Sequence, residues 1–134
     1  MDIEFEAISE LAPGPKWQAL FNRHWPAYHK WFLSEGDAER TPYLASVRQL
    51  RTHMPELLPT YERLVELAGG GDAAARFLSL YRPPPYLSGC SQAVWLGTEP
   101  FLVRNYDYSP RLCEGTVLYS QWNGRKVMAM VDCL

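Results

Sequence analysis

The sequence predicts an α+β protein in which a helical first part precedes a mostly antiparallel β-sheet. Up to about position 81 the apolar residues recur every three or four positions, which is the period of an amphipathic helix. From Cys90 onward the period changes to two, which is typical of strands. Between the two parts, Pro83-Pro84-Pro85 favours extended chain. We therefore divide the chain into a helical segment, 1–89, and the first strands of a sheet, 90–134.

The N-terminal residues 1–14 alternate weakly and predict a short strand or an extended arm. The first helix then follows from a stripe of apolar, mostly aromatic residues at helical spacing: Trp17, Leu20, Phe21, Trp25, Tyr28, Trp31 and Phe32. Pro26 lies within this stripe and lacks an N–H, so we expect a kink or two consecutive short helices there.

Three further helices are expected before the triple proline. Thr41-Pro42 predicts a helix start, with the Thr41 hydroxyl as N-cap and proline at the first helical position. Thr60 is a candidate cap for the next helix, which Gly69-Gly70-Gly71 should end. Asp72 is expected to cap a last helix that continues to Tyr81.

The second part predicts four strands joined by short turns. Asn123-Gly124 is the strongest hairpin signal, because both residues tolerate positive φ. The run 127–131 is apolar throughout, as in strands that are buried on both faces, and the chain stops soon after it. We therefore expect that a C-terminal region covering this sheet is missing. The predicted strands are 90–96, 101–108, 116–122 and 125–134.

Composition excludes several classes of function. The 134 residues suffice for one domain, and a net charge of −2 without a basic block argues against nucleic-acid binding and an anionic membrane surface. The apolar runs are far shorter than the ~20 residues that span a bilayer, and the acidic N-terminus does not resemble a secretion signal. Three cysteines are an odd set, which favours a reducing cytoplasm over a disulfide framework. Of these, Cys113 and Cys133 are interpreted as non-catalytic.

Cys90 is the residue best suited to nucleophilic chemistry. It follows Gly89 directly and opens the first predicted strand. If its thiol attacks the Gly89 carbonyl, the peptide bond breaks and Cys90 becomes a new amino terminus, whose α-amine is basic enough to activate its own sulfur. Glycine offers little steric obstruction to this attack. The alternative interpretation is a small buried apolar residue, as most free cysteines are.

Arg104 and Asp107 are predicted to lie beside Cys90, because a short turn folds the second strand back onto the first. An odd separation puts them on opposite faces of a regular strand, so a bulge or strand end near Tyr106 is needed to turn both towards the thiol. The alternative is an edge-strand ion pair, which contributes little to stability.

The segment Gly89-Cys90-Ser91-Gln92, followed by Leu102-Val103-Arg104-Asn105-Tyr106-Asp107, resembles the N-terminal-nucleophile (Ntn) amidohydrolases related to choloylglycine hydrolase. Because a glycine precedes the cysteine, the segment most resembles the isopenicillin-N (acyl-CoA:6-aminopenicillanate) acyltransferase branch of this family. Precursors in that branch cleave themselves at Gly-Cys. The resemblance implies an αββα sandwich, with 1–89 as the pro-segment and 90–134 as the start of a longer β-chain.

The resemblance also implies a role for each matching residue. Cys90 would be the autoproteolytic and catalytic nucleophile, Arg104 would orient the thiol and substrate, and Asp107 would fix the α-amine. Asn105 and Tyr106 would support the substrate pocket. The family's oxyanion-hole asparagine lies downstream and has no counterpart here. The implied substrate is a small linear amide or thioester, with no metal or cofactor, and a homo-oligomer or association with a C-terminal segment is a candidate assembly.

Other candidate sites have weaker signals. The histidines, His24, His29 and His53, lack partners at metal-ligand spacing. His24 and His29 lie on the aromatic helix and are interpreted as packing or surface residues. Gly69-Gly70-Gly71 is not followed by the lysine of a phosphate-binding loop, which argues against nucleotide binding. The tryptophan stripe of the first helix could line a ligand groove, but an aromatic helix core is the more common arrangement.

Two rival functions remain open. One is a non-catalytic module that binds a peptide or a sister subunit through the aromatic helix or an exposed sheet edge. The other is a thiol enzyme that uses Cys90 without cleaving itself. An intact chain with a slowly reacting Cys90 would favour the module, whereas an intact chain with one rapidly alkylated thiol would favour the second enzyme.

Overall fold

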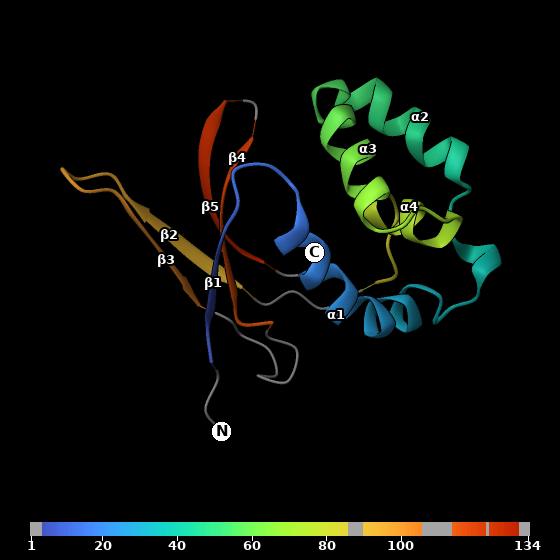
Figure 1. The fold of residues 1–134 in the computed structure, drawn as a ribbon, viewed down its shortest axis with the longest axis horizontal. Coiled ribbons are helices and arrows are strands. Elements are labelled where there is room, and N and C mark those ends of the chain that lie inside the picture. The colour runs from blue at the N-terminus through green and yellow to red at the C-terminus, as the bar shows by residue number, and fades with distance from the viewer. Residues whose placement is uncertain (1–3, 86–89, 106–113, 123, 132–134) are drawn as a thin grey trace.

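The computed structural model describes residues 4–85, 90–105, 114–122 and 124–131, and it confirms the α+β class (Figure 1). The helices are α1 (Pro15–Phe32), α2 (Tyr43–His53), α3 (Leu58–Leu67) and α4 (Asp72–Leu78), with short 3-10 turns at Asp37–Glu39 and Pro55–Leu57. The strands are β1 (Glu6–Ser9), β2 (Ser91–Trp95), β3 (Phe101–Asn105), β4 (Thr116–Trp122) and β5 (Arg125–Val131).

The described strands form two sheets. A three-stranded sheet has the order β1-β4-β5, in which β1 runs parallel to β4 and β5 runs antiparallel to it. The strands β2 and β3 form a separate antiparallel hairpin. The N-terminal strand β1 thus pairs with a strand from the second half of the chain. In this pair Glu6 lies opposite Thr116, and Ser9 lies opposite Tyr119. This pairing was not predicted, and the division of the chain at 89/90 remains a prediction.

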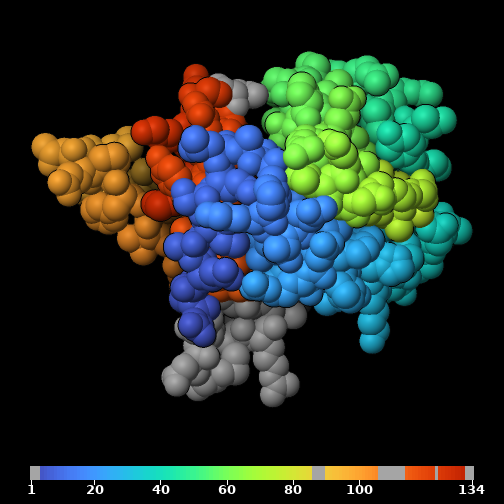
Figure 2. Space-filling model, viewed as in Figure 1, coloured from blue at the N-terminus to red at the C-terminus, as the bar shows by residue number. Residues whose placement is uncertain are grey.

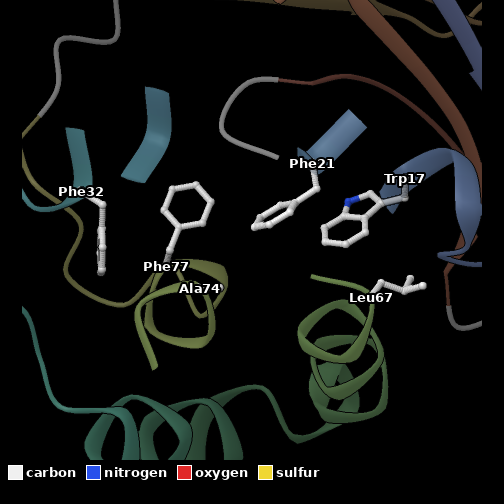
Figure 3. Close-up of a cluster of buried hydrophobic side chains, with 6 residues drawn as sticks. All are labelled: Trp17, Phe21, Phe32, Leu67, Ala74 and Phe77. Atoms are coloured by element: carbon white, nitrogen blue, oxygen red, sulfur yellow. The ribbon is translucent and has the colours of Figure 1, made fainter. Parts of the chain in front are cut away.

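Helix α1 lies between the sheet and the other helices (Figure 1). Its buried residues Trp17, Phe21 and Phe32 meet Leu67, Ala74 and Phe77 in one hydrophobic core (Figure 3). Trp25 and Trp31 are half-buried against this core. The aromatic stripe is thus a helix core, as the more common arrangement predicted. The helix continues through Pro26 as one element, so the predicted division into two helices is wrong.

The start of α1 is held by a residue from outside the helix. The Glu10 carboxylate accepts hydrogen bonds from the backbone N–H groups of Gly14, Lys16 and Trp17, each at 3.0 Å. Glu10 therefore serves the donors that a first helical turn leaves unpaired. A Cβ at Gly14 would lie 2.8 Å from Glu10 Oε1, so a larger residue there would displace the carboxylate. Since Glu10 N–H also donates to Tyr119 O at 2.9 Å, the same residue joins the helix to the sheet.

The predicted starts of the later helices need correction. Helix α2 begins at Tyr43 with Pro42 as its N-cap and no side-chain capping bond, so the Thr41 hydroxyl is not the cap. Helix α3 begins before Thr60, because the chain enters it from the 3-10 turn at Pro55–Leu57. The N-cap of α4 is Gly71, and Asp72 is its first residue.

The hairpin of β2 and β3 projects away from the rest of the molecule (Figures 1 and 2). Every residue of β2 is exposed, and so are all but one of β3. The β4–β5 hairpin forms at the predicted position, with Trp122 opposite Arg125. Residues 127–131 are half-buried or exposed rather than buried on both faces, because no described element covers the face that carries Met128.

Candidate functional site

Cys90 lies half-buried immediately before β2, at the base of the projecting hairpin. The strand starts one residue later than predicted, so the thiol belongs to the joint between the two halves of the chain. Gly89, the residue whose carbonyl the proposed cleavage would attack, lies outside the described residues.

The register of the hairpin determines what faces Cys90. Gln92 pairs directly with Arg104, and Ser91 pairs with Asn105. Gln92 and Arg104 therefore share one face of the hairpin, because directly paired residues lie on the same side of a sheet. Cys90 precedes the strand; if the ladder continued to position 90, Arg104 would be its diagonal neighbour, within reach of a long side chain. The proximity of Arg104 to Cys90 remains a prediction, because the paired residues of the hairpin begin at Ser91.

The hairpin changes in character along its length. Its base carries the polar pairs Ser91 with Asn105 and Gln92 with Arg104. Its outer half is apolar on both faces and exposed: Val94 62 %, Trp95 60 %, Leu96 84 %, Phe101 55 %, Leu102 44 % and Val103 56 %. Cys90 therefore lies next to the polar base of the hairpin, with an exposed apolar outer half beyond it.

Of the remaining predicted site residues, Asn105 is described and two others are not. Tyr106 and Asp107 lie outside the described residues, and the bulge expected near Tyr106 remains a prediction. Asn105 is the last residue of β3 and is exposed at the base of the hairpin. Sequence reasoning did not assign a role to Gln92, although it belongs to the quoted motif. The strand pattern could have predicted that Gln92 pairs with Arg104. This pairing follows once the turn is centred between Trp95 and Phe101.

A second feature, a cleft of about 690 Å³, lies between the three-stranded sheet and the helices α2 and α3. Cys90 and Arg104 do not line it. Leu118 and Ala129, which face each other across β4 and β5, form part of one wall. Leu50 and Leu64 form part of the opposite wall. The sequence did not predict this cleft, because it depends on how far apart the sheet and the helices stand.

The three histidines lie in helices α1 and α2. Within the described ranges, no group of three or more His, Cys, Asp or Glu residues is placed to hold a metal ion. His29 and His53 are exposed, whereas His24 is half-buried beside Tyr28. Burial, reinforced by the charge of Arg23, lowers the pKa of His24 below its ordinary value. These placements agree with packing and surface roles.

Comparison of the chain with protein-family models, with curated proteins and with solved structures finds no match. Among the described residues, none of the helices combines the length and the apolar character that crossing a bilayer requires.

Proposed function

We propose that this chain is the precursor of an autoprocessing Ntn cysteine amidohydrolase or acyltransferase, cleaved between Gly89 and Cys90. The observation that supports the proposal is the position of Cys90 immediately before β2, the strand that pairs with the strand carrying Arg104. A nucleophile at the start of a strand, with a cation and one amide side chain on the neighbouring strand, is compatible with such chemistry. The motif shared with the Ntn amidohydrolases supports the same assignment.

The cleavage step would convert an amide into a thioester and then into an acid. Cys90 Sγ attacks the carbonyl carbon of Gly89, and the C–N bond breaks as the thiol proton passes to the leaving nitrogen. Water then hydrolyses the Gly89 thioester, which releases a carboxylate on Gly89 and a free thiol and α-amine on Cys90. Together, these two steps consume one water molecule and need no oxidant or metal.

Turnover of a substrate would use the same sulfur. The α-amine of Cys90 takes the thiol proton, the thiolate attacks a linear amide or thioester, and the amine or thiol leaves with that proton. Water or an acceptor amine then removes the acyl group. Arg104 would orient the thiol and the substrate carbonyl, Asp107 would hold the α-amine, and Asn105 and Tyr106 would contact the substrate.

A reagent that requires a free 1,2-aminothiol tests the proposal. 2-Cyanobenzothiazole condenses with an N-terminal cysteine, so incubated wild-type protein should gain one label on a fragment that begins at Cys90. Cys90→Ala should stay unlabelled, and Cys113→Ala, which keeps Cys90, should label as the wild type does. A wild-type chain that is alkylated quickly at Cys90 but never takes the aminothiol label would contradict self-processing and favour the thiol enzyme.

A second candidate, a non-catalytic interaction module, is favoured by the exposed hairpin. Six apolar side chains of β2, β3 and their turn, each 44–84 % exposed, make a larger apolar area than scattered surface residues do. An extended edge of this kind can add a strand from a peptide or a sister subunit. If Leu96→Asp with Leu102→Asp abolishes self-association while Cys90 remains unreactive, the module accounts for the chain better than the enzyme does.

A further inference from the structure

We propose that the cleft between the three-stranded sheet and α2–α3 is a binding site for one hydrocarbon chain, of the kind carried by a medium-chain fatty acid. This site is separate from Cys90 and does not depend on the function proposed above. The cleft volume of about 690 Å³ falls within the roughly 300–1,000 Å³ typical of small-molecule sites.

The walls of the cleft come from both parts of the fold. On the sheet side, Leu118, Ala129 and Val131 contribute apolar side chains from β4 and β5. On the helix side, Leu50 and Leu64 face them from α2 and α3. Further apolar lining comes from α1, from the end of α4 and from the segments next to the helices: Pro13, Trp17, Leu20, Met54, Leu57, Leu78 and Leu80.

Four of the polar side chains around the cleft already have partners within the chain. Tyr61 Oη donates to Ala75 O at 2.9 Å, and Ser79 Oγ donates to Arg76 O at 2.6 Å. Ser120 Oγ donates to Leu11 O at 3.4 Å. The Glu10 carboxylate is occupied by the three N–H groups at the start of α1. A ligand body rich in hydrogen-bonding groups would find few partners here and would lose its water, which disfavours it.

One polar pair lies at the exposed rim and fits the head of such a ligand. A ring nitrogen of His53 and Gln49 Oε1 are 3.1 Å apart, and both residues line the cleft. His53 is exposed, so a carboxylate at this position keeps its contact with water while it meets the Gln49 amide N–H or the imidazole. The arrangement favours an amphiphile whose chain enters the cleft and whose head stays at the rim.

Titration with a series of saturated fatty acids tests this assignment. Hexanoate, octanoate, decanoate and dodecanoate, each below its micelle concentration, are titrated calorimetrically at several temperatures. Burial of each methylene should raise the affinity about fourfold until the chain fills the cleft, and the heat-capacity change on binding should be negative. Trp17 and Trp122, which line the cleft, should change their fluorescence with the same midpoint. Affinities that do not depend on chain length would overturn the proposal.

Matched variants locate the site. Ala129→Phe places a ring in the cleft and should weaken dodecanoate binding tenfold or more. Met128→Phe, on the exposed side of the same strand, should leave the affinity unchanged. Far-UV circular dichroism checks that both variants fold. Leu96→Asp with Leu102→Asp should also bind normally. If this hairpin variant loses binding while Ala129→Phe keeps it, the ligand occupies the projecting hairpin and the assignment is wrong.

Discussion

Two phenylalanines in contrasting surroundings, Phe77 and Phe101, give a quantitative test of which apolar groups the fold buries. Phe77 is 1 % exposed, and its ring centroid lies 5.3 Å from that of Trp25, 5.4 Å from Tyr28 and 5.7 Å from Phe32. Truncation of a buried phenylalanine to alanine costs about 3–5 kcal/mol, and each aromatic contact contributes roughly 0.5–1.5 kcal/mol. With three such contacts, we expect Phe77→Ala to lower the free energy of unfolding by about 4 kcal/mol.

Phe101 undergoes the same chemical change on the exposed hairpin. It is 55 % exposed, and its ring stacks on Trp95 at a centroid distance of 6.4 Å. Because most of this side chain already contacts water, we expect Phe101→Ala to cost less than about 1 kcal/mol.

Urea unfolding followed by far-UV circular dichroism measures both changes. With a slope of about 2 kcal/mol per molar, Phe77→Ala should move the midpoint down by about 2 M, and Phe101→Ala by less than about 0.5 M. The free energy of unfolding of a domain of this size is about 5–15 kcal/mol. For most values in this range, the Phe77→Ala variant still folds in water. Equal costs at the two positions would refute the reasoning, because they would mean that the hairpin is as well covered as the helix core.

Three further predictions concern Glu10, Tyr61 and Arg104. Burial raises the pKa of Glu10, but the stronger combined effect of its three N–H donors and the Lys16 charge lowers it, so Glu10→Gln should cost about 0.5–2 kcal/mol at neutral pH. This cost should disappear as the pH falls through the lowered pKa, as thermal melts from neutral to acid would record. Burial, with smaller effects of neighbouring groups, raises the pKa of Tyr61 to about 12, so an unfolded chain releases this proton first and stability is lost as the pH rises from about 10 to 12. The wild type should lose about 1.4 kcal/mol per pH unit more than Tyr61→Phe in that window, and parallel melting curves would contradict the assignment. Arg104→Gln should slow aminothiol labelling at Cys90 about 10- to 100-fold, whereas Arg125→Gln on β5 should not, and equal rates would remove Arg104 from the site.

The sequence predicted those features that follow from local pattern. The aromatic stripe around Trp17 and Phe21 predicted a buried helix face, and Asn123-Gly124 predicted the hairpin between β4 and β5. The change of period near Cys90 located the first strand to within one residue. Each of these signals lies within a few residues of the element that it specifies, so chain pattern alone suffices.

Features that depend on distant parts of the chain were missed. The parallel pairing of β1 with β4 joins segments about a hundred residues apart, and a four-residue strand carries little pattern of its own. The sequence did not predict the capping of α1 by Glu10 either, because the accepting carboxylate precedes the helix by several residues. Thr41 and Thr60 satisfied the sequence rule for a cap, yet the chain enters α2 and α3 differently. The cleft behind Leu118 depends on spacing between layers, which no sequence period encodes.

The site itself remains a prediction. The motif around Cys90 indicated a nucleophile, and the hairpin register pairs Arg104 with Gln92 of the same motif. The role of Asp107 depends on a departure from regular strand geometry, and such a departure cannot be derived from alternation alone. The contrast between the polar base of the hairpin and its apolar outer half became visible only when strand pairing assigned each residue to a face.

The central claim is that Cys90 cuts the chain at its own amino side, and the intact mass of purified protein over several days tests it most directly. We predict that the wild type converts to two fragments, 1–89 and 90–134, whose masses together exceed that of the intact chain by one water. Cys90→Ala should remain whole under the same conditions. A wild-type chain that keeps its full mass throughout, or a Cys90→Ala chain that splits at the same bond, would contradict the claim.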